Sequence, residues 1–291
     1  MPSDPHAVGS HDRPIASFDL TGACTQQCRH CYFSALSPSQ INRRLARRKF
    51  LSRLRRLIAR HGTHTALWAG GEPMLRLGLL RAVLPLFARN AISTSGMHPI
   101  PTDLGAGLLV SLDGLSSEHD LLRGSGAFGN VRRHLAALSS QRYTISTTLT
   151  LPTLCSIELL PRLIEATRAQ GALVGFYVGR ASSPFAIPAD LRSRAVDRLH
   201  AVSERYAGAI LNSELGLELL RPSHAKELSA HCLYRRTAVA FDPLLEQRLP
   251  CVFGSQANCG ACGSPLVAEQ RAKELGSVAS ERVVNALFEA G

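Results

Sequence analysis

Residues 15–32 read Ile-Ala-Ser-Phe-Asp-Leu-Thr-Gly-Ala-Cys-Thr-Gln-Gln-Cys-Arg-His-Cys-Tyr. The first six residues are mostly apolar and predict a short strand over Ile15–Leu20. Cys24, Cys28 and Cys31 follow with the spacing C-x3-C-x2-C on the segment that leaves this strand. Parallel α/β folds place their active sites at the carboxyl ends of their strands. The segment is therefore a candidate metal-binding loop at such an end.

Five more apolar runs follow, most of them separated by segments with helical periodicity. They are Thr65–Ala69, Ala91–Thr94, Leu108–Leu112, Tyr143–Leu151 and Ala172–Val178. Strands that alternate with helices indicate a parallel sheet covered by helices, so we expect an α/β layer or barrel over residues 15–210. A flexible leader is expected over 1–14. The alternation of strands and helices stops after about residue 212. Residues 211–291 are predicted to form a small metal-bearing appendage with a hairpin around Asp242-Pro243 and a terminal helix.

Composition and charge narrow the class of protein. The chain has 291 residues, of which 45% are apolar and 19% charged, which excludes global disorder. The longest apolar runs are far too short to cross a bilayer, and the first residues lack the apolar core of a signal peptide, so we expect a cytoplasmic protein. The net charge of +11 comes largely from a basic amphipathic helix between Arg43 and Arg60. This helix predicts a solvated surface, a docking face for an acidic redox protein or, third, a nucleic-acid contact.

The remaining cysteines form a second group. Cys232, Cys251, Cys259 and Cys262 end in C-x2-C, whereas Cys155 stands alone. Four ligands fill an iron–sulfur or zinc site, but the first group supplies three thiolates. A cubane cluster held by three cysteines keeps one iron open, as a catalytic metal requires. His30 would instead complete a zinc site.

Three further motifs follow the first cysteine group in a fixed order. They are Gly70-Gly71-Glu72-Pro73, Val110-Ser111-Leu112-Asp113-Gly114 and His119-Asp120-x-x-Arg123-Gly124-x-Gly126-x-Phe128. With the cysteine loop, this order resembles the signature of the radical S-adenosylmethionine (SAM) superfamily over residues 15–180. The resemblance implies a partial (β/α)6 TIM-like barrel and a [4Fe–4S] cluster on Cys24, Cys28 and Cys31, whose open iron binds SAM.

The resemblance also implies roles around SAM. Gly70, Gly71 and Glu72 would hold the amino group through backbone and side chain, and Tyr32 would pack beside the adenine. His30 stands before Cys31, where an aromatic residue is common in the family.

The other end of SAM is expected to meet a separate set of residues. Ser111 and Asp113 would lie near the SAM carboxylate or ribose. Arg180, just beyond the sixth strand, would pair with that carboxylate or else be a solvated loop residue.

The second cysteine group resembles the shortened auxiliary-cluster domain, called twitch, of SPASM-type relatives. It implies one auxiliary [4Fe–4S] cluster on Cys232, Cys251, Cys259 and Cys262; a structural zinc knot is the alternative. The Cys251 thiol has a second possible role as a hydrogen-atom donor to the substrate. Cys155 competes for that role, unless it is a buried apolar residue.

A compact barrel with one auxiliary cluster resembles radical SAM enzymes that tailor sugars and cyclitols of aminoglycoside antibiotics. The spare cysteines favour an epimerase; a dehydrogenase that passes an electron to the auxiliary cluster is the alternative. Asp19, Glu118 and Asp120 are candidates for binding a cationic sugar, and a flavodoxin or ferredoxin is the expected reductant. Two other classes stay open: a peptide-modifying radical SAM enzyme, and a zinc-stabilised basic module that binds nucleic acid, for which aromatic platforms are scarce.

Overall fold

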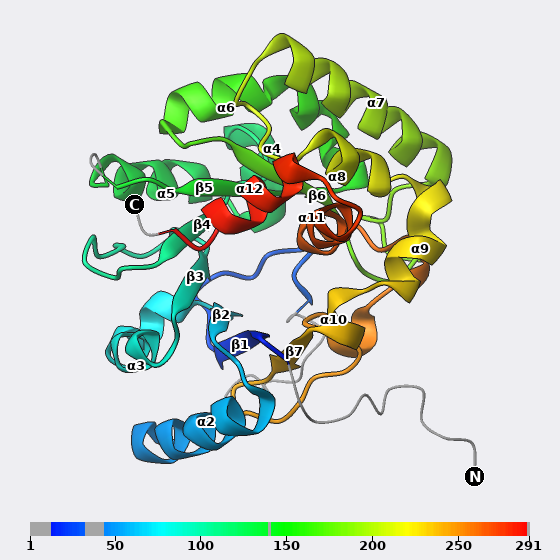
Figure 1. Cartoon of the computed structure of the whole chain (residues 1–291). Coiled ribbons are helices and arrows are strands. Elements are labelled where there is room, and N and C mark those ends of the chain that lie inside the picture. Colours follow the sequence, from blue (N-terminus) through cyan, green and yellow to red (C-terminus); the bar gives the residue numbers. More distant parts are fainter. Residues whose placement is uncertain (1–12, 33–43, 139–140, 290–291) are drawn as a thin grey trace.

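The computed structural model describes residues 13–32, 44–138 and 141–289. Its centre is a seven-stranded parallel sheet in the order β6-β5-β4-β3-β2-β1-β7. The strands are β1 Ile15–Thr21, β2 Thr65–Gly70, β3 Arg89–Thr94, β4 Gly107–Ser111, β5 Thr144–Leu149, β6 Ala172–Phe176 and β7 Ala238–Phe241. The sheet curls into a half-barrel (Figure 1), which confirms the expected α/β partial barrel and its first six strands.

Helices cover the outer face of the sheet and continue into the C-terminal region. The α-helices are α2 Arg47–His61, α3 Leu77–Val83, α4 Ser116–Arg123, α5 Ala127–Ala136, α6 Leu160–Thr167, α7 Ala189–Arg205, α8 Glu214–Leu219, α9 Ala225–Ala230, α10 Leu233–Arg236, α11 Pro265–Glu274 and α12 Val278–Ala286. The 3-10 turns are η2 Pro73–Arg76, η3 Leu84–Leu86, η4 Leu151–Leu159, η5 Pro222–His224, η6 Gly254–Gln256 and η7 Cys259–Ala261. None of the described helices is long and apolar enough to span a membrane.

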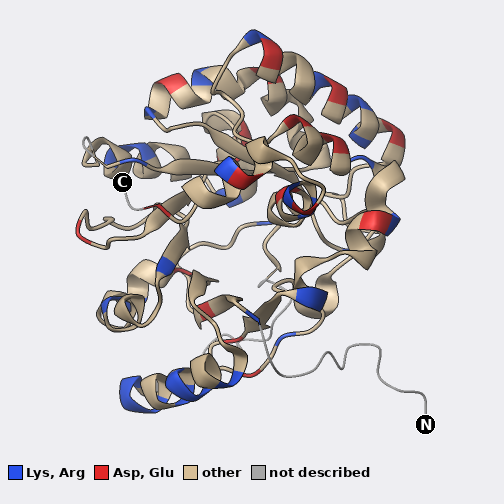
Figure 2. Ribbon diagram, in the orientation of Figure 1, with Lys and Arg blue, Asp and Glu red and all other residues tan. Residues whose placement is uncertain are grey.

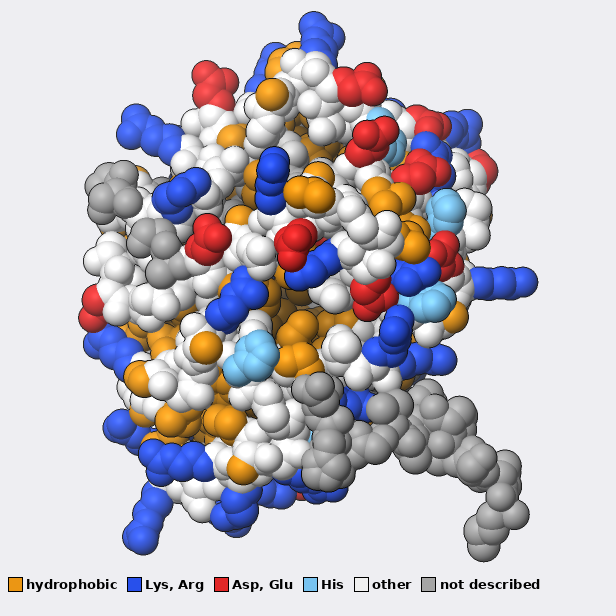
Figure 3. Space-filling view, in the orientation of Figure 1, with side chains coloured by type: hydrophobic (Ala, Val, Ile, Leu, Met, Phe, Trp, Pro, Cys, Tyr) orange, Lys and Arg blue, Asp and Glu red, His pale blue; other side chains and the backbone are white. Residues whose placement is uncertain are grey.

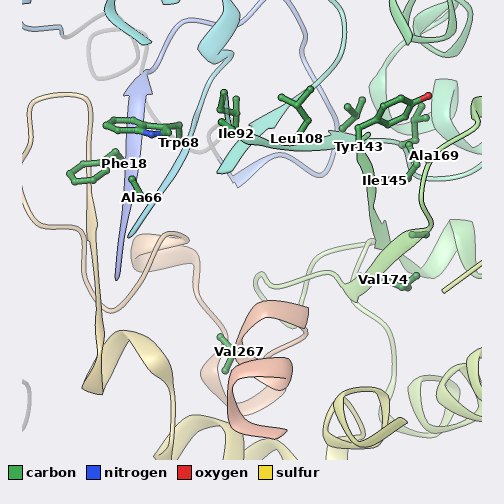
Figure 4. Close-up of a cluster of buried hydrophobic side chains, with 14 of the residues drawn as sticks. Phe18, Ala66, Trp68, Ile92, Leu108, Tyr143, Ile145, Ala169, Val174 and Val267 are labelled. Carbon is green, nitrogen blue, oxygen red and sulfur yellow. The ribbon is translucent and has the colours of Figure 1, made fainter. Parts of the chain in front are cut away.

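The main core lies between the sheet and these outer helices. Side chains from successive strands, including Phe18, Trp68, Ile92 and Ile145, lie in a row along this face (Figure 4). Phe18 and Trp68 stack at 4.9 Å between ring centroids, and both are fully buried. Burying one such side chain contributes about 1.5–3 kcal/mol, so this row is a large part of what holds the barrel together.

The inner face of the half-barrel is closed at one end by the C-terminal helices. Leu109 and Leu173 pack with Leu287, at the end of α12, in a cluster separate from the main core. A Cβ on Gly107 would lie 2.1 Å from the carbonyl oxygen of Leu287, so only glycine allows this close approach. The α12 helix therefore lies directly against the strand that it covers, as Figure 1 shows.

The seventh strand comes from the region that the sequence assigns to an appendage. Residues 238–241 pair in parallel with β1, and the returning segment makes a single antiparallel bridge between Phe241 and Gln247. The Arg13 guanidinium donates to the carbonyl oxygen of Ala238 at 2.7 Å, and the hydroxyl groups of Ser17 and Tyr234 are 2.7 Å apart. The expected hairpin is therefore reduced to one bridge, because its first strand joins the main sheet.

Candidate functional site

The first cysteine loop is fastened to the end of β2 by two glycines. The backbone N–H of Gly71 donates to the Thr21 carbonyl at 2.7 Å, and that of Glu72 donates to the Ala23 carbonyl at 2.9 Å. A Cβ on Gly71 would lie 2.2 Å from the Ala23 oxygen, and Gly70 has a φ of +114°. Both positions therefore need glycine for the cysteine loop to lie on the end of the sheet.

Glu72 is fully buried, and protein donors surround its carboxylate. One oxygen accepts from the Met74 N–H at 3.0 Å and from the Thr94 hydroxyl at 2.8 Å. The other accepts from the Ser95 N–H at 2.8 Å and from the Ser95 hydroxyl. The side chain thus ties η2 to the end of β3, and its expected contact with the SAM amino group stays a prediction.

The three thiols of the first group line a large cavity at the carboxyl ends of the strands. The cavity measures about 1420 Å³ up to its open mouth. Its wall includes Cys24, Cys28, Cys31, Gly70, Gly71, Tyr32 and the hydroxyl-bearing residues Ser93, Ser111, Ser146 and Thr148. No Asp or Glu within the described ranges lines it, and Arg123 is the arginine that does. The described wall is therefore largely apolar, with hydroxyl groups and one cation but no carboxylate.

A buried ion pair stands beside the cysteine loop. The Arg123 Nε donates to the Asp113 carboxylate at 2.6 Å, and His30 Nε2 lies 3.4 Å from the same oxygen. Burial alone would raise the pKa of Asp113, but Arg123 and His30 lower it to about 2. Burial also lowers the pKa of His30 to about 4. His30 is thus turned toward Asp113, in its neutral form at pH 7.

The second cysteine group lines an adjoining cavity. Cys232, Cys251, Cys259 and Cys262 line a space of about 470 Å³, measured up to its open mouth. Val178, Tyr234, Phe253 and Ser264 line both this space and the larger one. The two cysteine groups therefore lie on either side of a shared wall.

Burial shifts several thiols, from both groups, toward their neutral form. Burial raises the pKa of Cys28 to about 11, that of Cys251 to about 12 and that of Cys262 to about 11. A metal binds the thiolate, so loading either group would release these protons and would become more favourable as the pH rises. In the described part of the chain, no three His, Cys, Asp or Glu side chains converge closely enough to hold a single metal ion.

Arg248 connects the two cysteine groups. Its guanidinium is 2.5 Å from the Asp19 carboxylate and donates to the Val252 carbonyl, next to Cys251, at 3.1 Å. It also lies over the ring of Tyr32, which follows Cys31, at 5.9 Å. Burial raises the pKa of Asp19 to about 7, although Arg248 opposes the shift. Asp19 is therefore engaged inside the protein and does not line the cavity.

Glu72 and Asp113 are fully buried and do not line the cavity. Four further predicted residues are not brought to its wall either. Cys155 is exposed on η4, and Arg180 is exposed beyond β6. Asp120 accepts from the backbone N–H groups of Gly126 and Phe128 at 2.7 and 2.8 Å, so it caps the start of α5.

The fourth, Glu118, accepts from the neighbouring Ser117 hydroxyl at 2.6 Å. Sequence reasoning gave Arg123 no role of its own, although its place in the motif after Asp113 was a usable signal.

Comparisons with known proteins agree on the fold. No protein-family model matches the chain. Pre-heme d1 synthase of Dinoroseobacter shibae is 26% identical over 152 residues, which are 48% of this chain and 36% of that protein. Streptococcus suis SuiB bound to S-adenosylmethionine has a TM-score of 0.64 at 18% identity, over 85% of this chain and 62% of that one.

A second solved structure, native anSMEcpe with bound AdoMet (S-adenosylmethionine), has a TM-score of 0.66 at 13% identity, over 95% of this chain and 84% of that one. Both proteins also have solved structures with bound peptides. The chain spans about a third of the synthase and under two thirds of SuiB. At such low sequence identities, the structural similarity shows a shared fold and nothing more.

Proposed function

We propose that this protein is a radical SAM enzyme. The observation that carries the proposal is the set of three thiols on one loop, seated by Gly70 and Gly71 on the carboxyl end of a parallel half-barrel and open to its interior. With SAM bound, a [4Fe–4S] cluster on Cys24, Cys28 and Cys31 would supply a 5′-deoxyadenosyl radical for hydrogen abstraction.

Arg123 is the residue that we assign to the SAM carboxylate, in place of the exposed Arg180. Its Nε donates to Asp113, which orients the guanidinium, and the side chain lines the cavity beside the cysteine loop. A planar guanidinium fits a carboxylate through two parallel hydrogen bonds. Asp113 acts in this proposal by positioning Arg123.

The second cysteine group would hold one auxiliary [4Fe–4S] cluster. Its support is that all four cysteines line one cavity, which shares a wall with the substrate space. Four cysteines around a structural zinc ion are the alternative. Iron, sulfide and zinc analysis of the purified protein separates the two.

The substrate that we propose is a sugar-type small molecule. Serine and threonine hydroxyls in the wall are suited to hydrogen bonding with the hydroxyl groups of a sugar ring. The absence of carboxylates among the described lining residues gives an aminoglycoside's ammonium groups no partner inside, so we place such groups at the cavity mouth. A peptide substrate is the second candidate, because both structural relatives have been solved with peptides.

Epimerisation is the reaction that we favour, with Cys251 as hydrogen donor, in which case Cys232, Cys259 and Cys262 alone hold the auxiliary cluster. Cys155 is exposed and away from the cavity, whereas the residues that follow Cys251, Val252 and Phe253, line it. The 5′-deoxyadenosyl radical would take one hydrogen atom from a carbon and the thiol would return one to its other face, so the product has the same composition as the substrate. One electron from the reductant and one proton would then restore the thiol from its thiyl radical. Oxidation of an alcohol would instead remove two hydrogens.

The basic helix α2 would dock an acidic flavodoxin or ferredoxin as reductant. Figure 2 shows Lys and Arg concentrated on α2, while acidic and basic residues are mixed on α7. In Figure 3, basic side chains surround the lower edge of the molecule, over α2. Seven exposed cations make this surface: Arg44, Arg47, Arg48, Lys49, Arg55, Arg56 and Arg60.

Anaerobic turnover in D2O tests the proposal. Reconstituted protein is incubated with SAM and panels of sugars, aminoglycosides and peptides, and products are read by mass spectrometry. Formation of 5′-deoxyadenosine with a product heavier by one dalton supports epimerisation, and Cys251→Ala should abolish the inversion while Cys155→Ala should not. A product two daltons lighter supports the dehydrogenase. No 5′-deoxyadenosine with a protein that carries the first cluster would refute the radical SAM assignment.

A further inference from the structure

Arg192, on α7, is a buried cation beside the second cysteine group. The residue is 4% exposed. Its Nη2 donates to the carbonyl oxygen of Cys262 at 2.6 Å and its Nη1 to that of Ala261 at 2.8 Å. Its Nε donates to the carbonyl oxygen of Leu220 at 2.7 Å, and the guanidinium lies 4.8 Å from the ring centre of Phe176. The side chain is therefore firmly attached to the turn that carries two cysteines.

The hydrogen bonds of Arg192 are satisfied, but its charge is not balanced by the protein. Within the described residues, none of the ion pairs includes Arg192. The neighbouring acids of α7 are used elsewhere, because Asp190 pairs with Arg194 and Asp197 pairs with Arg221. A buried charge without a counter-charge is strongly unfavourable. Carbonyl groups relieve this cost only in part, so the arrangement points to a negative charge supplied from outside the chain.

The second cysteine group is where such a charge would come from. The Arg192 guanidinium is held against the backbone of Cys262, a member of this group. Three thiolates around a [4Fe–4S] core with a charge of +2 carry a net charge of −1, and one-electron reduction makes it −2. A fourth thiolate at Cys251 would add one more negative charge. Metal loading would therefore turn an unbalanced cation into half of a charge pair.

We propose that Arg192 is the counter-charge of the metal–thiolate group of the second cysteine group, to which Cys232, Cys259 and Cys262 belong, and that it positions the Cys259–Cys262 turn. The inference rests on the proposed auxiliary cluster and adds a role for a residue outside the cysteine motifs. Because the reduced cluster is the more negative form, a fixed cation stabilises it and raises the reduction potential. Arg192 would thus make this cluster a better electron acceptor.

The test compares three variants of the full chain. Arg192→Met removes the charge, Arg192→Lys keeps it, and Arg194→Met removes an exposed arginine from the same helix as a matched control. Iron, sulfide and zinc are measured first, and each cluster is then titrated by EPR against potential. Thermal unfolding of the metal-free and loaded forms supplies a readout that does not depend on activity.

Arg192→Met should shift the equilibrium of the second cluster toward the oxidised form by tenfold or more, which is about 59 mV or more for one electron. Its gain in melting temperature on metal loading should be smaller than in the wild type. Arg192→Lys and Arg194→Met should lie near the wild type in both readouts. The proposal is also supported if the Arg192→Met variant binds no metal at the second cysteine group while the Arg192→Lys variant does.

Two results would overturn it. An unchanged potential and an unchanged stabilisation by metal in Arg192→Met would refute the role of Arg192 while the auxiliary cluster stands. A wild-type protein that binds metal at the first cysteine group alone would refute the auxiliary cluster itself, and the inference with it.

Discussion

Replacing Asp113 by Asn should destabilise the protein through the cation that it leaves behind. Asp113 is completely buried, and Arg123 holds it through a 2.6 Å contact to Nε. An asparagine side chain is nearly isosteric with aspartate but neutral. The substitution therefore removes the negative charge without opening a cavity, and the buried guanidinium loses its counter-charge.

The size of the effect follows from the pair. A pKa lowered from 3.8 to about 2 corresponds to about 2 kcal/mol of stability. Breaking a buried pair by removing one partner costs about 3–5 kcal/mol, because the other charge stays unpaired. We therefore expect Asp113→Asn to lose about 3 kcal/mol at pH 7. The double variant Asp113→Asn/Arg123→Met should recover much of that loss.

The pH dependence has a definite sign. The folded state lowers the pKa of Asp113, so its stabilisation is fully present above the unfolded pKa near 4 and is lost as the pH falls toward 2. The wild type should lose its advantage over Asp113→Asn across this window.

Anaerobic urea denaturation of metal-free protein measures these differences, with fluorescence of Trp68, the one tryptophan, as the signal. Binding of SAM to the loaded protein is measured separately, since Arg123→Met should weaken it. A double variant that is as unstable as the sum of the two single variants would refute the reasoning, because it would show that the charges act independently.

Three further changes test other parts of the site. Glu72→Gln turns an acceptor into a donor that faces the Ser95 N–H, and should lower the free energy of unfolding in urea by about 1–3 kcal/mol. An unchanged stability would contradict the role of Glu72 in tying η2 to the end of β3. Cys155→Ala should leave iron content and turnover unchanged. A loss of either would show that Cys155 contributes to the site. Arg48→Glu/Arg55→Glu on α2 should slow turnover with a flavodoxin donor at low salt but not with dithionite. Equal effects with both reductants would exclude α2 as the docking face.

The strands and the cysteine loop could be predicted because their signals are local. Six apolar runs had the length and composition of buried strands, and the first ended directly before three cysteines. Local sequence also explains why α3 stops at Val83 and continues as a 3-10 turn, because Pro85 cannot continue an α-helix. These features depend on neighbouring residues along the chain.

Long-range pairing could not be predicted in this way. Residues 238–241 are apolar and strand-like, but the sequence does not state that their partner is β1 rather than the segment that follows. The sequence also does not show which partner a polar side chain contacts. Asp120 has the residue type of a ligand for a cationic substrate, yet the free N–H groups at the start of α5 capture it. Arg192 lies in a helix pattern that gives no sign of its buried environment.

The pairing of β7 with β1 has a consequence for dividing the protein. Without β7, β1 would become an exposed edge with open backbone groups, a known starting point for aggregation. A shortened chain that ends near residue 211 would also lack the helices that fill the barrel's closed end. The two cysteine groups therefore belong to one folding unit, and grafting the second onto another barrel would require transplanting a strand along with it.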